Sequence, residues 1–152
     1  MAGWTNRGKK RILNYFFRRE GGLPSNFYLA LCTAAQTPNA DTNVFGDLTQ
    51  ITVGNGYSDG GITIAPNGSN FAYLSEDDAN DLAVMIMTQL GWIADGGNLP
   101  ASGNGARWLV LTDDNATMAS REVLCFWDLG GDRVVSDQQS LILNDITIRA
   151  TE

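Results

Sequence analysis

The sequence predicts an all-β protein: an antiparallel β-sandwich or jelly roll with one N-terminal amphipathic α-helix. Its 152 residues are 43% hydrophobic, which supplies enough apolar surface for one core but leaves too little chain for two. After Pro24 the spacing of apolar residues changes from a helical period to a period of two. Short apolar segments then alternate with Gly- and Asn-rich turns, without the strand–helix alternation of a parallel sheet. We therefore expect a single domain over residues 1–152, with a basic helix at 5–19 and the β-sandwich at 26–149.

The first element expected is the helix at 5–19. Thr5 or Asn6 is suited to cap its start, and the Gly21-Gly22 pair is suited to end it. Gly8 lowers its propensity by about 1 kcal/mol relative to alanine, so tertiary packing must help to hold it. At about 100° per residue, apolar and cationic side chains fall on opposite sides. The apolar side holds Ile12, Leu13, Tyr15, Phe16 and Phe17, and the cationic side holds Arg7, Lys10, Arg11 and Arg18. We expect the apolar side to pack on the sandwich or on a neighbouring subunit.

The first strand is expected at 26–33, where Phe27, Leu29 and Leu31 fall on one face. Residues 34–47 contain Pro, Asn and Asp and predict a loop. Short strands are expected at 49–53 and 61–65 around a Gly-Asn-Gly turn, and another at 71–74.

The second half of the chain predicts longer strands. Residues 75–81 are acidic and predict a loop or a single helical turn. Residues 82–93 are largely apolar and predict one central strand, with a helix as the alternative because of their Met and Leu content. The last strands are expected at 106–112, 122–129 and 140–149. In the final strand the alternation slips near Asn144, which predicts a β-bulge.

Cys32 and Cys125 each lie inside an apolar strand segment. They have no CxxC spacing, and no secretory signal core precedes them. We therefore expect two buried, unpaired thiols that pack like small hydrophobic side chains.

Charge is distributed unevenly along the chain. The first nineteen residues carry six of the ten basic residues and no acidic residue, whereas the rest of the chain carries a charge of −13. Such asymmetry is typical of a binding arm joined to a body of opposite charge. An acidic body repels phosphates, so we expect no nucleic-acid partner. No apolar run is long enough for a membrane span, so we expect no membrane insertion.

The sequence does not indicate a catalytic site. Histidine is absent, which excludes Ser-His and Cys-His nucleophile pairs and histidine ligands to zinc. The densest acidic cluster, Glu76, Asp77, Asp78 and Asp81, has carboxylates that suit calcium but lacks EF-hand spacing, so a solvated loop is the favoured interpretation. Asp113 and Asp114 are expected to form a turn. We expect no catalytic residue, no metal and no cofactor.

A docking site for a partner is expected at the N-terminus. Trp92, Trp108 and Trp127 lie in apolar strands and are expected in the core, whereas Trp4 precedes the helix and is suited to be an exposed anchor. A helix face with charges of one sign only is unusual for a purely solvated surface. The expected docking residues are Trp4, Arg7, Lys9, Lys10, Arg11, Arg18 and Arg19.

Several segments resemble a family of small virion proteins of tailed bacteriophages. They are NRGKKRILNYFFRR (6–19), NFYLALCT (26–33), GNGYSDGG (54–61), SEDDANDLA (75–83), ARWLVLTDDNAT (106–117) and REVLCFWDLGGDRVVSDQQSLILNDITIR (121–149). Members of this family have a leading helix followed by a β-sandwich and are head-decoration (cement), minor tail or tail-fibre proteins. The resemblance implies a non-enzymatic virion protein, assembled in the host cytoplasm, and brings no catalytic residues with it.

The resemblance leaves the position in the virion open. A decoration protein that binds and stabilises the major capsid shell is preferred, because the chain lacks the repeats and heptads of a fibre shaft. A tail or tail-fibre component that contacts the host receptor or baseplate is the alternative. A cell-wall hydrolase is disfavoured by the missing histidine and the missing carboxylate pair. The expected partners are major capsid or tail proteins of the same phage and further copies of the chain in a homo-oligomer.

Overall fold

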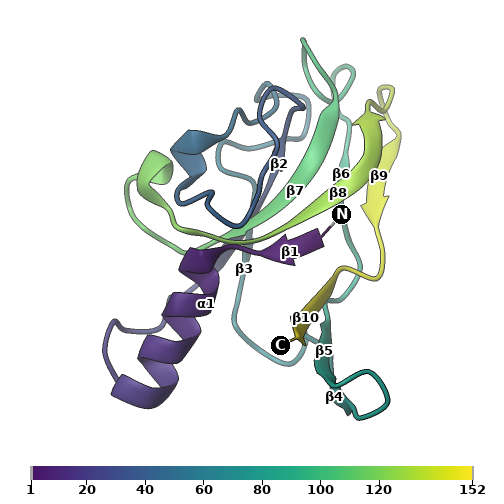
Figure 1. Cartoon of the computed structure of the whole chain (residues 1–152). Helices are drawn as coiled ribbons and strands as arrows, with labels where there is room; N and C mark the ends of the chain where they lie inside the picture. Colours follow the sequence, from purple (N-terminus) through teal and green to yellow (C-terminus); the bar gives the residue numbers. More distant parts are fainter. Residues whose placement is uncertain (1, 152) are drawn as a thin grey trace.

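The computed structural model describes residues 2–151 and shows a mostly β protein built from three antiparallel sheets (Figure 1). None of the three sheets closes into a barrel over these residues. A five-stranded sheet has the order β1 (Ala2–Trp4), β8 (Val123–Arg133), β7 (Ala106–Thr112), β2 (Phe27–Cys32), β3 (Ile62–Ile64). A three-stranded sheet has the order β10 (Thr147–Thr151), β5 (Leu82–Ile86), β4 (Tyr73–Asp77), and a two-stranded sheet pairs β6 (Leu90–Ile93) with β9 (Ser140–Leu143).

The five-stranded sheet carries buried side chains on both faces. On β2 and β7 the period of two sends Leu29, Leu31, Leu109 and Leu111 into one cluster, which also contains side chains from β6, β9 and β10. The intervening residues of β2 and β7 enter a second cluster with Phe45, which begins the short 3₁₀ helix η2 (Phe45–Asp47). The central strands are therefore covered on both sides, as their nearly continuous apolar sequence requires.

Two long apolar segments each divide between two sheets. Residues 82–93, expected as one central strand, form β5 and β6, and residues 140–149, expected as one bulged strand, form β9 and β10. The slip near Asn144 therefore marks a change of sheet and not a bulge, and Asp145 has a left-handed backbone there (φ 53°). Both breaks lie between the same two sheets, since β5 pairs with β10 and β6 pairs with β9.

Other elements differ from the expectation in their ends or in their presence. The acidic residues expected in a loop at 75–81 begin inside β4, which hydrogen-bonds to β5 as a hairpin. Residues 49–53 form no strand, and only Gln50 makes an isolated bridge, to Cys32. Strand β1 was not expected at all; its three residues pair with β8, with Trp4 opposite Cys125. A second 3₁₀ helix, η3 (Met118–Ser120), precedes β8.

The expected N-terminal helix is present as α1 (Asn6–Leu13), which continues without a break into the π-helical turn η1 (Asn14–Arg18). Thr5 is its N-cap, because its hydroxyl oxygen accepts a hydrogen bond from the Gly8 N–H at 3.0 Å. Arg19 ends it in the left-handed conformation (φ 57°). We call residues 6–18 the helical arm.

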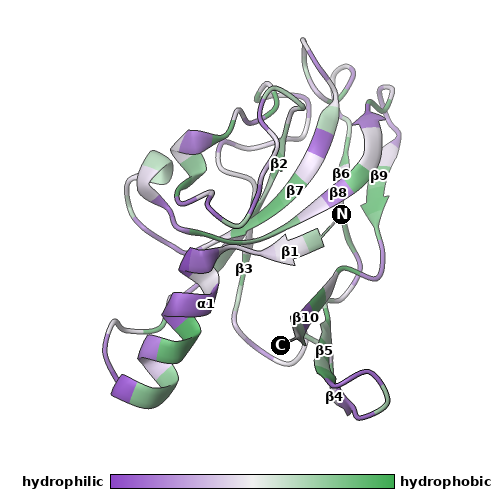
Figure 2. Cartoon of the chain, viewed as in Figure 1, coloured by the Kyte–Doolittle hydropathy of each residue, from purple (hydrophilic) through white to green (hydrophobic). Residues whose placement is uncertain are grey.

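The helical arm and the three-stranded sheet both project from the same end of the five-stranded sheet, with a gap between their ribbons (Figure 1). Figure 2 shows hydrophobic residues along the arm and on β5, whereas the connection from β4 to β5 is hydrophilic. This arrangement places two apolar projections opposite each other.

Both cysteines are free and buried, as expected, with 0% of Cys32 and 2% of Cys125 exposed. Burial raises the pKa of the Cys32 thiol to about 12 and also raises the pKa of Cys125. Neither thiol therefore offers a nucleophile at neutral pH.

We expect both thiols to resist alkylation by iodoacetamide in the folded protein, because reaction needs an exposed thiolate. The measurement is the mass of the chain with time, with the chain in denaturant as the control for full reactivity. Rapid double modification without denaturant, or the small mass loss of a disulfide, would contradict the buried position of these residues.

Candidate docking surface

The base of the helical arm is fixed to strand β8. The Thr5 N–H donates to the Leu124 carbonyl at 3.0 Å, and the Thr5 hydroxyl donates to the Val123 carbonyl. One turn later the buried Gly8 faces the same strand, where an added Cβ would lie 2.5 Å from the Leu124 carbonyl oxygen. The helix approaches the sheet this closely because position 8 has no side chain.

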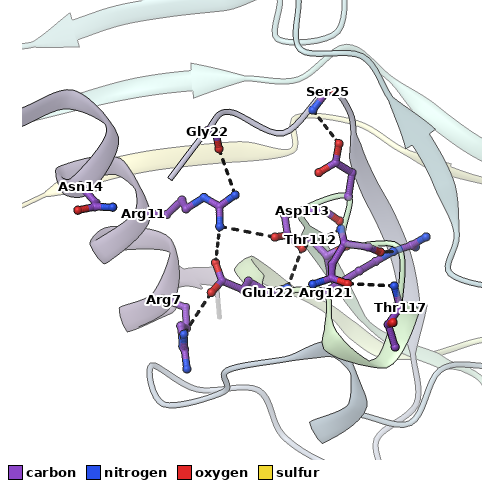
Figure 3. A network of polar contacts seen from close by, with 12 residues as sticks. Arg7, Arg11, Asn14, Gly22, Ser25, Thr112, Asp113, Thr117, Arg121 and Glu122 are labelled. Atoms are coloured by element: carbon purple, nitrogen blue, oxygen red, sulfur yellow. Dashed lines mark hydrogen bonds and ion pairs between the residues drawn. The ribbon is translucent and has the colours of Figure 1, made fainter. Parts of the chain in front are cut away.

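A cluster of charges holds the side of the arm that faces the body (Figure 3). Arg7 Nη1 lies 3.1 Å from Glu122 Oε1, and Arg11 Nη1 lies 3.0 Å from Glu122 Oε2. Arg11 also lies 3.8 Å from the buried carboxylate of Asp113 and donates to the Gly22 carbonyl at 3.2 Å. One carboxylate thus receives two guanidinium groups, and Arg11 links the arm to the segment that follows it.

The Asp113 carboxylate organises the loop beneath this cluster. Its Oδ1 accepts the N–H of Glu122 at 2.8 Å and the N–H of Asn115 at 3.4 Å. Asp113 thus makes the local side-chain contact of the expected turn, whereas the carboxylate of Asp114 accepts the N–H groups of Ser25 and Asn26 in a distant segment. Both carboxylates accept hydrogen bonds from backbone N–H groups, so both stabilise the local backbone conformation.

The cationic residues of the arm do not form the single free stripe expected from the sequence. Arg7 and Arg11 point to the body, because Glu122 and Asp113 supply partners there. Arg18 pairs with the neighbouring Glu20 at 2.9 Å on the exposed side. Within the described chain, Lys9, Lys10 and Arg19 make no ion pair and are exposed. These three, with Arg18, are the predicted residues that remain available to a partner.

Trp4 is not the exposed anchor expected from the sequence. It is half-buried in β1, packs against the main core cluster, and donates its indole N–H to the Arg149 carbonyl at 2.7 Å. Its position follows from the pairing of β1 with β8, which the sequence did not indicate. The three other tryptophans are in the core as expected, with exposed fractions of 3–9%.

The apolar residues of the arm are left largely in solvent, so of the two expected partners, the body of the same chain and a neighbouring subunit, the body covers little of them. Phe16 is 64% exposed, Phe17 73%, Leu13 57% and Ile12 49%. The two phenylalanine rings touch each other edge to face, with centroids 5.0 Å apart. Exposed apolar surface of this kind is typical of interaction sites, which makes it part of the candidate docking surface.

An apolar groove runs between the arm and the three-stranded sheet. Its volume is about 590 Å³. Ile12, Tyr15 and Phe16 line one wall, and Leu74 and Met85 line the other. The floor and ends are formed by Trp4, Phe27, Phe71, Leu111, Leu124 and Ile148. The groove has the size of pockets that take a ligand or a few large side chains.

Beyond the groove-lining residue Leu74, the β4–β5 hairpin carries exposed acidic side chains. Glu76, Asp78 and Asp81 are exposed there and make no ion pair within the described residues. We call these three residues the acidic rim. The sequence indicated a solvated acidic segment, and the structure places it beside exposed Leu74 (69%) and Tyr73 (53%).

The sequence did not indicate a role for Glu122 or Leu74. Glu122 binds the arm to the body, and Leu74 lines the wall of the groove opposite the arm. The only sequence signal for Glu122 was an acidic residue at the start of an apolar strand segment. The described residues contain no group of three or more His, Cys, Asp or Glu side chains placed to hold a metal ion. No helix among them has the length and apolarity that crossing a membrane requires.

Comparison with protein-family models, with curated proteins and with solved structures finds no match to this chain. The arm, the groove and the acidic rim, together with the resemblance stated above, are the features that indicate a function for this chain.

Proposed function

We propose that this chain is a non-enzymatic structural protein of a tailed-bacteriophage virion, and that it decorates and stabilises the major capsid shell. The observation that carries the proposal is the helical arm, which projects from the sheets with Phe16 and Phe17 in solvent beside an apolar groove. Such a surface supports a role in assembly, because the free energy of burying these side chains is available only when a partner covers them.

The fold and charge agree with this role. In the proposal the antiparallel sheets form the β-sandwich or jelly roll of the virion family that the sequence resembles. The helical arm carries five basic residues and no acidic residue, whereas the rest of the chain carries all seventeen acidic residues. An assembled particle would then bury the arm and present an acidic, soluble body. A tail or tail-fibre position is the alternative, because the same resemblance covers tail proteins.

We expect a tagged copy, produced during infection by its phage, to cover the capsid surface in hundreds of copies per particle. The measurement combines cryo-electron microscopy of labelled virions with the stoichiometry of this chain relative to the shell subunit. A control tag on the shell subunit calibrates the count. A handful of copies confined to the tail would replace decoration by the tail alternative, and absence from purified virions would reject both.

A further inference from the structure

The apolar surface of the arm and the acidic rim have matching chemistry. The arm presents exposed Leu13 and Phe17 beside the unpaired cations of Lys9 and Lys10. The hairpin presents exposed Leu74 beside the unpaired carboxylates of Glu76 and Asp78. Each surface therefore combines an apolar centre with charges of one sign, and the two signs are opposite.

Within one chain, the charged side chains of the arm do not pair with those of the hairpin. The arm and the hairpin form opposite walls of the groove, and no ion pair joins them among the described residues. The groove between them stays open, with a volume of about 590 Å³. That volume suits a few large side chains and not a whole domain.

We propose that the occupant of the groove is the helical arm of a second copy of this chain. The phenylalanines of the incoming arm enter the groove, and its Lys9 and Lys10 meet the acidic rim of the receiving copy. This inference names a partner for the surface on which the proposed function rests. The decorating unit is then an oligomer in which each copy gives an arm and receives one.

Charge complementarity favours a second copy over an unrelated protein. Every chain carries both the cationic arm and the acidic rim. Each contact between copies therefore joins a cationic apolar surface to an anionic apolar surface. Phe16 and Phe17 are 64% and 73% exposed, and burying rings of this size removes on the order of 200–300 Å² from water. Reciprocal exchange of arms doubles that area and closes the assembly without unpaired surfaces.

The test is the mass of the purified full-length chain in solution, measured by sedimentation equilibrium over a range of concentration and salt. We expect an oligomer that dissociates more readily as salt rises, because screening weakens the charge contacts. Reversing the arm charges (Lys9→Glu with Lys10→Glu) or the rim charges (Glu76→Lys with Asp78→Lys) should weaken association on the order of tenfold or more. All four side chains are exposed or at the hairpin tip, so the variants should keep the unfolding transition of the native chain.

Mixing the two variants gives the decisive outcome. The glutamates of the reversed arm can pair with the lysines of the reversed rim, and the unchanged arm can pair with the unchanged rim, so a one-to-one mixture should regain the oligomer. Leu13→Ser with Phe17→Ser should also dissociate it, whereas the matched control Val134→Ser with Ile142→Ser, which changes exposed side chains outside the groove, should not.

A native chain that stays monomeric at all concentrations overturns the inference, as does a mixture of reversed variants that stays dissociated. A monomer that still decorates particles would reject arm exchange and leave the proposed function intact. An oligomer that never appears on virions would support arm exchange and reject the proposed function.

Discussion

Replacing Gly8 by valine is expected to lower the free energy of unfolding by about 3 kcal/mol and to displace the helical arm from strand β8. A Cβ at this position would lie 2.5 Å from the Leu124 carbonyl oxygen, 3.0 Å from the Leu124 Cα and 3.0 Å from the Trp4 ring. The Leu124 atoms belong to the backbone of β8, which is paired on both sides by β1 and β7. They cannot move aside without disturbing the five-stranded sheet.

Alanine at position 8 separates the contact from helix propensity. In a solvated helix, alanine is more favourable than glycine by about 1 kcal/mol. Here the overlap with β8 should outweigh that gain and leave a net loss of about 1 kcal/mol. Denaturant titration of Gly8→Val, Gly8→Ala and the control Gly22→Ala measures these losses, because no atom lies within 4 Å of a Cβ added at Gly22. Stabilisation by Gly8→Ala would show that the arm is not seated on β8.

The sequence predicted the elements whose pattern is local. The helix at 5–19 and the strands β2 and β7 follow from period and composition, since their apolar residues repeat at 3.6 or at 2. Thr5 as N-cap also follows from its own side chain and the next few residues. The second core, on the opposite face of β2 and β7, was not predicted, although the nearly continuous apolar sequence of these strands is typical of strands covered on both faces.

The orientation of the arm could not be predicted in the same way. The usual rule sends the apolar side of a helix to the body, but here the body side holds Gly8, Arg7 and Arg11. The reason is the carboxylate of Glu122, which lies 115 positions from Arg7 in the chain and comes beside it only after β1 pairs with β8. A pairing between distant segments leaves no periodic signal near either one.

The groove also depends on such pairings. Residues 82–93 are apolar except for a few positions, among them Thr88 and Gln89, which lie between β5 and β6. The two strands join different sheets because β10 and β9 bind them separately. The left-handed residue Asp145 sets the point where the C-terminal segment changes sheet. Without that change the hairpin that carries the acidic rim would not face the arm.

Replacing Glu122 by alanine is expected to lower the free energy of unfolding by about 2 kcal/mol, because hydrogen bonds between charged groups contribute more than neutral ones. Glu122 is only 22% exposed and receives Arg7 and Arg11 at 3.1 and 3.0 Å. Most of this loss should come from the ion pair with Arg11, whose side chain is 31% exposed. The Arg7 side chain is 42% exposed, so solvent screening weakens its ion pair with Glu122. The matched control is Glu20→Ala, which removes an exposed pair with Arg18 and should cost at most about 0.5 kcal/mol.

The Glu122 variant should loosen the arm more than the sheets. Without the carboxylate, Arg7 keeps Asn43 and Arg11 keeps Asp113 at 3.8 Å and the Gly22 carbonyl, so the arm is held more weakly along its body side. Limited trypsin digestion should therefore cut at Lys9, Lys10, Arg18 or Arg19 faster in Glu122→Ala than in Glu20→Ala, while the body stays resistant. A double-mutant cycle with Arg11→Met should give a coupling free energy on the order of 1–2 kcal/mol. Equal digestion rates and a coupling near zero would mean that the backbone contacts of Thr5 and the close approach of Gly8 hold the arm without the charge cluster.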